Sequence, residues 1–389
     1  MLPKKLNKKL EERIANNAFR KLGQSNNLVD FSSNDYLGFS KSQSIFDASH
    51  HYLVKHGLKQ NGATGSRLLS GNHQLYTEVE AQLCAIHNSK TALICNSGYD
   101  ANIGLLSSIP QRGDIILYDE LVHASIRDGI TMSNAKSYKF KHNDLEDLEK
   151  KCRAERLAFQ SLVRRTGSRS LKDSEIFIIT ESVFSMDGDS PDLKTMSQMS
   201  KTYNAHLIVD EAHAIGVFNT GLVQELGLES DIFVRIITFG KALGCHGAAI
   251  LGPKGLKDYL INFSRSFIYT TALPPHALAT MLMAYDALKS TDQIQKLRER
   301  IKFFESEIIR QQLSHAFIKS QSAIHSCVIS GNERIKKVAQ QLHHKGFDVK
   351  PILSPTVPEG KERLRFCLHS YNSQAEISEV LSLLATFVT

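Results

Sequence analysis

The sequence predicts an α/β protein whose large domain has three layers, with a mostly parallel sheet between two layers of helices, followed by a small C-terminal α+β domain. Between residues 91 and 252, short apolar runs alternate with helical patterns, as expected for strands buried on both faces of a parallel sheet. After Pro274-Pro275 this alternation ends, and the length of 389 residues leaves room for a second, smaller core. We therefore expect an N-terminal helix and arm over residues 1–45, a large domain over 46–285 and a small domain over 286–389.

The chain begins with a segment whose apolar residues Leu6, Leu10 and Ile14 recur at helical spacing. We expect this segment to be a helix whose apolar side lies on something else. It leads into two stretches rich in turn-forming residues, 30–40 and 61–73, which we expect to be loops.

Six apolar runs are predicted to be the strands of the large domain. They cover residues 91–95, 114–119, 175–182, 206–213, 234–240 and 248–252. Helical patterns lie between several of these runs, for example over residues 191–204. The segment 153–173 differs from them because it is polar and contains five arginines, so we expect it to be an inserted surface connection.

The small domain is predicted to begin with a long amphipathic helix. Its apolar stripe consists of Ile294, Leu297, Ile301, Phe304 and Ile308. The stripe is too short for a coiled coil, so we expect it to pack against a core. Short strands are expected within residues 326–330, 347–353 and 363–368, with one helix ending near Gly346 and another at the end of the chain.

The composition is that of a globular protein, with 42% hydrophobic and 22% charged residues. The 47 basic and 40 acidic residues give a formal net charge of +7, which is modest for this length. The basic residues are scattered along the sequence, so we expect no nucleic-acid partner, although an anionic substrate or cofactor is compatible with the charge.

The six cysteines form neither a CxxC pair nor a Cys/His spacing typical of a metal site. We therefore expect reduced thiols, no bound metal and a cytoplasmic protein. The N-terminal segment is basic but lacks the apolar core of a signal peptide, and no apolar run reaches membrane-spanning length. No membrane association is expected.

Chemically reactive side chains follow several of the predicted strands. Asp210 ends one strand, with His213 three residues further on, and Lys241 follows another strand. Ser97-Gly98 begins a helix after a third strand, and His123 follows a fourth. Because the carboxyl ends of parallel strands meet at one edge of a sheet, we expect these side chains to converge there.

This combination is what a pyridoxal phosphate site requires. A lysine forms the covalent link to the cofactor aldehyde, a carboxylate pairs with the ring nitrogen, and a helix N-terminus binds the phosphate. Each element alone has a more common structural explanation, because lysines are mostly solvated and a strand-terminal aspartate usually caps a turn or helix. The prediction therefore rests on the whole set, whose members follow different strands.

The segment Asp210–His213 allows a second interpretation, since Asp-Glu-Ala-His after an apolar strand is similar to the acidic box of nucleic-acid-dependent helicases. Such an enzyme needs an upstream G-x-x-x-x-G-K-[ST] loop to bind nucleotide phosphates. The two Gly-Lys pairs of the chain, at residues 240–241 and 360–361, lie downstream and are followed by Ala and Glu. This excludes the helicase interpretation.

Nine short motifs carry a family resemblance, which runs from about Leu10 to the end of the chain. They are SSNDYLG (32–38), GATGSRLLSG (62–71), SGY (97–99), HAS (123–125), ESVFSMDGD (181–189), VDEAHAIG (209–216), TFGKALG (238–244), IYTTALPP (268–275) and PTVPEGKERLR (355–365). Together they resemble the α-oxoamine synthases, which are pyridoxal phosphate enzymes of fold type I, the aspartate aminotransferase fold.

The resemblance implies that the catalytic residues are Lys241, His123, Asp210 and His213. In that family pattern, Lys241 carries the cofactor, Asp210 pairs with the ring nitrogen and His123 stacks on the ring. Ser185 and His213 bind the phenolic oxygen of the ring. The cofactor phosphate contacts are Ser97, Gly98, Tyr99, Thr238 and, from a neighbouring subunit, Thr271 or Thr270.

The same resemblance implies contacts to the substrates. Asn34 and Arg365 would bind the carboxylate of the amino acid, and Thr356 would line the substrate site. Arg20 would bind the distal carboxylate of the acyl chain. The chain departs from some members of the family at Leu353, where those members have an arginine.

The implied reaction is the decarboxylating condensation of L-alanine with pimeloyl-CoA, or with the equivalent acyl-carrier-protein thioester, in biotin synthesis. A homodimer with shared active sites is expected. Other reactions of the family stay open at this stage, namely those of glycine C-acetyltransferase, 5-aminolevulinate synthase and long-chain acyl-CoA condensing enzymes. A non-catalytic subunit is the alternative from another class, and the presence of Lys241, Asp210, His123 and Arg365 argues against it.

Overall fold

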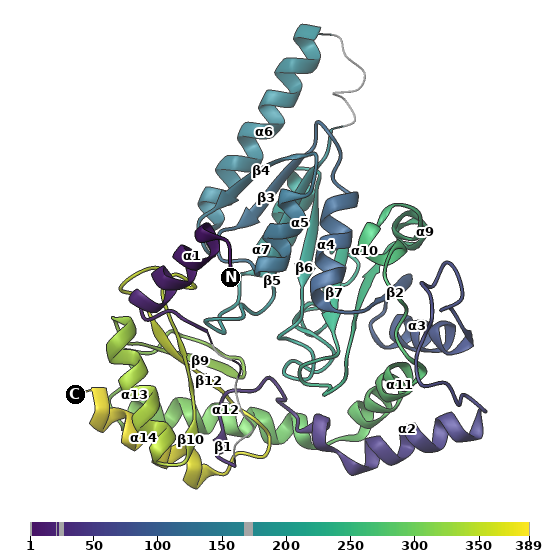
Figure 1. Ribbon diagram of the computed structural model, residues 1–389. Coiled ribbons are helices and arrows are strands. Elements are labelled where there is room, and N and C mark those ends of the chain that lie inside the picture. The colour runs from purple at the N-terminus through teal and green to yellow at the C-terminus, as the bar shows by residue number, and fades with distance from the viewer. Residues whose placement is uncertain (1, 21, 23–26, 167–173, 389) are drawn as a thin grey trace. The chain divides into compact units, whose positions relative to one another are not determined.

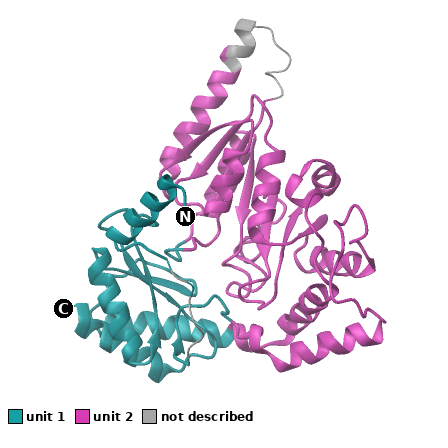
Figure 2. Ribbon diagram, viewed as in Figure 1, with its two compact units in different colours: residues 1–36, 186–189, 295–389 teal, residues 37–185, 190–294 magenta. Residues whose placement is uncertain are grey.

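The computed structural model describes residues 2–20, 22, 27–166 and 174–388. The chain forms two compact units, which are coloured separately in Figure 2. Unit 1 comprises residues 1–36, 186–189 and 295–389, and unit 2 comprises residues 37–185 and 190–294. The division at residues 45 and 285 that the sequence suggests stays a prediction.

The described part of unit 2 contains a sheet of seven strands (Figure 1). They are β2 (Thr91–Cys95), β3 (Ile115–Asp119), β4 (Lys136–Phe140), β5 (Ile176–Glu181), β6 (Ala205–Asp210), β7 (Val234–Thr238) and β8 (Ala248–Gly252), in the order β2-β8-β7-β6-β5-β3-β4. Strand β8 is antiparallel to β2 and β7, and the other neighbouring strands are parallel. The sheet is therefore mostly parallel, as predicted.

Helices surround this sheet. They are α2 (Gln43–Lys55), α3 (Gln74–Ile86), α4 (Gly98–Ser108), α5 (Ala124–Thr131), α6 (Leu145–Thr166), α7 (Leu193–Thr202), α8 (Leu222–Glu225), α9 (Lys254–Phe263), α10 (Arg265–Ile268) and α11 (Pro275–Ser290), with a 3-10 turn η1 (Phe39–Lys41). The expected loops at residues 30–40 and 61–73 contain only this turn and the two-residue strand β1 (Val29–Asp30) at their edge.

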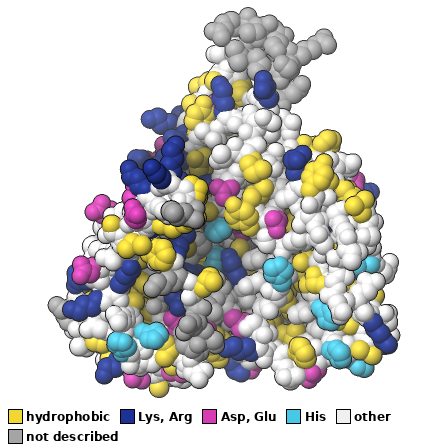
Figure 3. Space-filling model, viewed as in Figure 1, with side chains coloured by type: hydrophobic (Ala, Val, Ile, Leu, Met, Phe, Trp, Pro, Cys, Tyr) yellow, Lys and Arg dark blue, Asp and Glu magenta, His cyan; other side chains and the backbone are white. Residues whose placement is uncertain are grey.

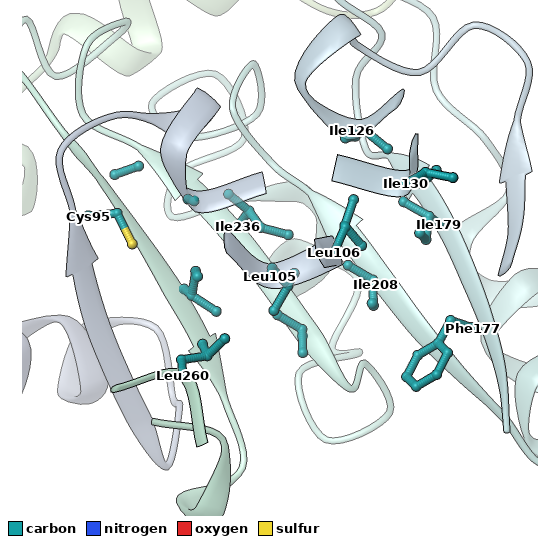
Figure 4. Close-up of a cluster of buried hydrophobic side chains, with 14 of the residues drawn as sticks. Cys95, Leu105, Leu106, Ile126, Ile130, Phe177, Ile179, Ile208, Ile236 and Leu260 are labelled. Atoms are coloured by element: carbon teal, nitrogen blue, oxygen red, sulfur yellow. The ribbon is translucent and has the colours of Figure 1, made fainter. Parts of the chain in front are cut away.

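The strand side chains alternate between two apolar clusters, one on each face of the sheet. Ile208 on β6 belongs to a cluster that includes side chains of α4, α5, α9 and α10, part of which is drawn in Figure 4. Its neighbours Leu207 and Val209 belong to a second cluster, which includes side chains of α6, α7 and α8. Because both faces of the inner strands are buried, most of their positions favour an apolar residue, which explains the continuous apolar runs. The predicted three-layer fold class is confirmed.

Two segments of unit 2 differ from the sequence prediction. Strand β4 was not predicted, because it is an edge strand that pairs with β3 and exposes four of its five residues, so its sequence has no apolar run. The expected surface connection at residues 153–173 is wrong for residues 153–166, which continue helix α6. Ion pairs one turn apart, Lys151 with Asp147 and Arg153 with Glu149, support this polar helix. Residues 167–173 lie outside the described part of the chain.

The described part of unit 1 has two small sheets. Strands β11 (Lys350–Ile352), β12 (Arg363–Cys367) and β9 (Ile324–Val328) form an antiparallel sheet, and β1 pairs in parallel with β10 (Phe347–Asp348). The helices are α1 (Lys4–Ala15), α13 (Asn332–His344), α14 (Gln374–Val388) and α12 (Gln293–Arg310), whose first two residues belong to unit 2. Leu297, Ile301, Phe304 and Ile308 of the predicted stripe on α12 are buried, while Ile294 at its start is only partly buried.

Helix α1 forms where the sequence predicts it. Leu6, Leu10 and Ile14 are all exposed, and the helix buries none of its residues against the described part of the chain. The amphipathic pattern therefore gives the helix correctly, while what its apolar stripe lies on stays a prediction.

The described surface shows charge of both signs. On the face drawn in Figure 3, lysine and arginine side chains lie among acidic and neutral ones. None of the helices in the described residues is long and apolar enough to cross a membrane. Within the same residues, no group of three or more His, Cys, Asp or Glu side chains is arranged to hold a metal ion.

Candidate active site

The reactive side chains of unit 2 meet at one edge of its sheet. Because β8 is antiparallel to both β2 and β7, strand β2 runs in the same direction as the parallel strands. The carboxyl ends of β2, β3, β5, β6 and β7 therefore share one edge, where ligands of such sheets bind. An open pocket of about 520 Å³ lies there, lined by Gly98, Tyr99, Asn102, His123, Ser125, Glu181, Ser185, Asp210, Ala212, His213, Thr238 and Lys241.

Lys241 lies in a tight turn after β7. Its Nζ is 2.6 Å from Nε2 of His213, which belongs to the turn after β6. The Lys241 carbonyl accepts a hydrogen bond from the N–H of Gly244, whose φ is +61°. A Cβ at Gly244 would lie 2.1 Å from the nitrogen of Ser40, so this position requires glycine. The turn thus fixes the lysine amine beside an imidazole that can exchange a proton with it.

Asp210 ends β6 with both carboxylate oxygens bound. Oδ1 accepts a hydrogen bond of 2.9 Å from the N–H of Ala212, and Oδ2 accepts one of 2.8 Å from the amide nitrogen of Asn102. Asn102 lies on α4 and is buried. A nearly buried carboxylate needs such donors, and here they fix its orientation in the pocket wall.

His123 caps the N-terminus of α5 at the mouth of the pocket. Its Nδ1 accepts a hydrogen bond of 3.2 Å from the N–H of Ser125, and its own N–H donates one of 2.6 Å to Oε1 of Glu181. Partial burial of the ring lowers the pKa of His123, neighbouring Asp210 opposes this shift, and Lys241 lowers the pKa further. The arrangement favours a neutral imidazole at neutral pH.

Glu181 is a second buried carboxyl group in the pocket wall. It ends β5 directly beside Asp210, its partner in the strand register. Burial, and next the negative charge of Asp210, raise the pKa of Glu181 to about 8. Two adjacent buried carboxyl groups thus lie side by side, Asp210 with a donor on each oxygen and Glu181 with the backbone N–H of His123 as a donor.

Helix α4 begins at the pocket and can bind an anion at its N-terminus. Gly98 is its first residue, and a Cβ placed there would be 3.8 Å from Thr238, so the approach to the backbone is open. The free N–H groups of a first helical turn and the helix dipole favour a phosphate. Tyr99 lines the pocket, and its hydroxyl donates to Asp128 at 2.6 Å.

Two predicted phosphate contacts do not line the pocket of the single chain. Ser97 is the N-cap of α4, where its hydroxyl donates to Asp100 at 2.8 Å and accepts from the N–H of Asp100 at 3.1 Å. Thr271 is exposed, and its carbonyl accepts a hydrogen bond of 2.8 Å from the side chain of Asn96. The other predicted cofactor residues, namely Gly98, Tyr99, His123, Ser185, Asp210, His213, Thr238 and Lys241, all line the pocket.

The four predicted substrate residues form two pairs within unit 1. The guanidinium of Arg365, on β12, donates at 3.0 Å to Oδ1 of Asn34, and the hydroxyl of Tyr36 donates to the same oxygen at 3.1 Å. Arg20 donates to the hydroxyl of Thr356 at 3.3 Å. In each pair, the fold brings together two residues that are more than 300 positions apart in the sequence.

Sequence reasoning missed four residues of the pocket wall, namely Asn102, Ser125, Glu181 and Ala212. The partner of Asn102 is 108 residues away, so no local pattern links the two. For Glu181 a signal was present, because it ends a predicted strand as Asp210 does, and neighbouring strands place such residues side by side.

The chain belongs to the aminotransferase class I and II family, whose model matches residues 26–384. Within this family it is similar to the 8-amino-7-oxononanoate synthase of Emericella nidulans, with 41% identity over 377 residues that cover 92% of this chain and 89% of the relative.

Two solved structures support the same grouping. The 8-amino-7-oxononanoate synthase of Francisella tularensis is 27% identical, with a TM-score of 0.75, and the match covers 92% of this chain and 97% of that one. The serine palmitoyltransferase of Sphingomonas wittichii is 26% identical, with a TM-score of 0.81, and the match covers 92% and 86%. The predictions of the family, of fold type I, of a pyridoxal phosphate-dependent acyltransferase and of pyridoxal phosphate as cofactor are confirmed.

Proposed function

We propose that this chain condenses L-alanine with a pimeloyl thioester to give 8-amino-7-oxononanoate, CO2 and the free thiol, a step of biotin synthesis. The observation that carries the proposal is the 41% identity with the Emericella nidulans synthase over 92% of the chain. The acyl carrier is CoA or an acyl-carrier protein, since both present the same thioester to the enzyme.

The donor set of the pocket fits pyridoxal phosphate. The amine of Lys241 points into a pocket that also contains a fixed carboxylate, Asp210, and the open N-terminus of α4. The amine matches the aldehyde of the cofactor, the carboxylate matches its ring nitrogen, and the helix N-terminus matches its phosphate. His123 and Ser185, on other parts of the wall, are suited to stack on the ring and to bind its phenolic oxygen.

Proton transfer at the substrate is assigned to Lys241 and His213. Pyridoxal phosphate, when bound, supplies the electron withdrawal that makes the α-proton of the amino acid acidic. The Lys241 amine is then the base that takes this proton, and Nε2 of His213, 2.6 Å away, is placed to share it. Asp210 keeps the ring nitrogen protonated, because a fixed carboxylate stabilises the adjacent positive charge.

Carboxylate recognition is assigned to unit 1. Arg365 is buried and its planar guanidinium can bind the carboxylate of alanine with two parallel hydrogen bonds, while Asn34 holds it in place. Arg20 and Thr356 form the second pair, and a cation at Arg20 suits the distal carboxylate of a pimeloyl chain.

We also propose a cytoplasmic homodimer in which each chain contributes to the site of the other. Thr271 supports this, because it is exposed and lies outside the pocket lining of its own chain. A threonine that binds phosphate from a neighbouring chain has these properties. Sedimentation of the purified protein as a monomer at micromolar concentration would contradict the dimer.

A long-chain acyl condensing reaction is the second candidate. The similarity to the Sphingomonas wittichii serine palmitoyltransferase favours it, with 26% identity and a TM-score of 0.81. The two candidates differ in both substrates. The second uses L-serine in place of L-alanine, and its acyl chain has no distal carboxylate.

A substrate matrix separates the two functions. The purified protein with pyridoxal phosphate is incubated with L-alanine, glycine or L-serine, each combined with pimeloyl-CoA, acetyl-CoA or palmitoyl-CoA, and products are identified by mass spectrometry. We expect turnover with L-alanine and pimeloyl-CoA at least about tenfold above every other pair. A preference for glycine with acetyl-CoA, or for L-serine with palmitoyl-CoA, would overturn the proposal while leaving the family unchanged.

A further inference from the structure

In the pocket wall, four side chains form one continuous hydrogen-bonded chain from Asp210 to His123. The amide nitrogen of Asn102 is 2.8 Å from Oδ2 of Asp210 and 3.1 Å from Oγ of Ser125. The Ser125 hydroxyl is in turn 2.8 Å from Nδ1 of His123. Asn102 and Ser125 are buried, and neither belongs to the residues that the sequence predicted for the site.

Chemistry fixes the direction of every hydrogen bond in this chain. Asp210 is acceptor-only as a carboxylate, and its other oxygen already accepts from the N–H of Ala212. Asn102 must therefore present its NH2 group, whose second hydrogen points to Ser125. A flipped Asn102 would place its amide oxygen against the carboxylate. In the present orientation that oxygen is buried without a hydrogen-bond partner among the described residues.

The same logic continues to the imidazole. Because the Ser125 oxygen accepts from Asn102, its own hydrogen is free to be donated to Nδ1 of His123. The backbone N–H of Ser125 also donates to Nδ1, at 3.2 Å. A nitrogen that receives two donors carries no proton, so the proton of a neutral imidazole is on Nε2.

We propose that Asn102 and Ser125 are positioning residues that transmit the ionised state of Asp210 to His123 and hold its imidazole neutral, with the proton on Nε2. The proposal rests on the proposed function in one respect, namely that His123 stacks on the bound cofactor. A protonated imidazole there would repel the positive charge that Asp210 stabilises on the ring nitrogen, because the two charges would be only a stacking distance apart.

The charged groups around His123 have opposing effects on the protonation of its ring, so hydrogen bonds that fix its protonation state are useful. Asp210 on β6 and Asp128 on α5 favour the protonated ring, while Lys241 after β7 and Arg127 on α5 oppose it. Glu181 on β5 accepts the hydrogen bond of the His123 backbone N–H. Partial burial is the largest influence and lowers the pKa of His123, in agreement with two donors to Nδ1.

The first test reads the pH dependence of the bound cofactor. Holoenzyme is titrated from pH 5 to 9 while the visible absorption band of pyridoxal phosphate is recorded, for the natural protein and for Ser125→Ala, Ser125→Thr and Ser108→Ala. Loss of one donor to Nδ1 makes protonation of His123 easier. The acid limb is the change of the band at low pH, and its midpoint reports protonation near the cofactor. We therefore expect this midpoint in Ser125→Ala to rise by about one pH unit, the size expected for one hydrogen bond.

The other variants separate positioning from general damage. Ser125→Thr keeps the hydroxyl and is expected to restore the natural acid limb. Ser108 lies on α4, is buried, and donates to the carbonyl of Gly104, so Ser108→Ala removes a buried hydroxyl outside the network and is expected to leave the acid limb unchanged. An unshifted acid limb in Ser125→Ala with normal cofactor binding would overturn the proposal. Absence of the band in the natural protein would instead reject the proposed function.

A second measurement needs no turnover, and its result is read from the natural protein. Long-range 15N–1H spectra of histidine-labelled protein without cofactor report which ring nitrogen is protonated, and the His123 signal is assigned by its loss in His123→Asn. We expect a neutral ring with its proton on Nε2 at pH 7. A proton on Nδ1, or a doubly protonated ring, would contradict the proposal.

Discussion

Single residues carry the proposed recognition of the substrate carboxylates. Arg365 is the central example, because it is buried on β12 and its guanidinium contacts Asn34 and Cys367 at close range. Burying a cation is unfavourable unless it is hydrogen-bonded, so these contacts fix its position, and the proposed carboxylate of alanine would complete them.

Arg365→Lys is therefore expected to weaken alanine binding although the charge is kept. A lysine is a point charge and cannot make the two parallel hydrogen bonds of the guanidinium, so we expect KM for L-alanine to rise about 10- to 100-fold. Steady-state kinetics measure this effect, with Arg153→Lys on the exposed face of α6 as the control. An unchanged KM for alanine would show that Arg365 does not bind the carboxylate of the amino acid.

Arg20 is expected to select the acyl chain by its charge. Arg20→Ala should raise KM for pimeloyl-CoA about tenfold, because one charge-assisted hydrogen bond to the distal carboxylate is lost. Heptanoyl-CoA has the same chain length without that carboxylate, so its KM should change little. Equal changes in KM for the two thioesters would show that Arg20 does not bind the distal carboxylate.

At the scale of elements, the segment 186–189 belongs to unit 1 and is held by its core. Ser185 lines the pocket, and the next residues are held in unit 1 by hydrogen bonds from Ser326 to the carbonyl of Met186 and from Ser320 and Ser322 to the carbonyl of Gly188. A buried ion pair between Asp187 and Arg363 adds a further contact. The segment is therefore strongly restrained next to a predicted cofactor residue.

Gly188→Ala tests this restraint. Gly188 has a φ of +76°, and a Cβ there would lie 2.1 Å from the carbonyl oxygen of Ile324. The backbone strain and the clash should together lower the free energy of unfolding by about 2–4 kcal/mol. Gly360→Ala is the matched control, because its φ is +79° but nothing lies within 4 Å of the added Cβ.

Thermal and urea unfolding compare the two alanine variants. Gly360→Ala should show the backbone strain alone, of about 1 kcal/mol. The difference between the variants is the contribution of the clash in the segment 186–189. Equal losses in both variants would contradict the close packing of Gly188.

Elements also show how far the sequence could predict this protein. Strands β5 and β6 were predictable because all residues of β5 and the last four of β6 are buried, which favours an apolar run. Strand β4 could not be predicted by this signal, since exposed edge residues are free to be polar. Polar helix α6 was missed for a related reason, because its long solvent-exposed face resembles a surface loop in composition.

The candidate site was predictable where function requires a particular residue type after a strand, as for Lys241 and Asp210. It was not predictable where a residue acts through another one. Asn102 and Ser125 are ordinary polar residues in a helix, and only the fold brings them between Asp210 and His123. Residues that position others therefore have no local sequence signal, even when they are as buried as the core.

At the scale of the whole molecule, buried histidines make stability depend on pH. His325 on β9 is buried against Phe304, and burial lowers its pKa to about 4, although a hydrogen bond to the backbone of Ser322 opposes this. The unfolded chain binds this proton near pH 6.5. The stabilisation from a neutral His325 is thus complete above about pH 6.5 and is lost as the pH falls toward 4.

His325→Leu should reduce the pH dependence of stability in that interval. One histidine contributes a slope of up to about 1.4 kcal/mol per pH unit, so the variant should lose less stability than the natural protein between pH 6.5 and 4.5. Urea unfolding at pH 7.5, 6.0 and 4.5 measures the slopes, and the exposed His315 gives the control His315→Leu. Parallel slopes in all three proteins would contradict a neutral, buried His325.

The central claim is that the pocket at the carboxyl edge of the sheet holds pyridoxal phosphate through Lys241. Its most direct test is reduction of the holoenzyme with sodium borohydride, followed by digestion and peptide mass spectrometry. We predict one phosphopyridoxyl group per chain, on Lys241, and none on that peptide in the Lys241→Ala variant. A protein that carries the group on another lysine, or on none, would contradict the assignment.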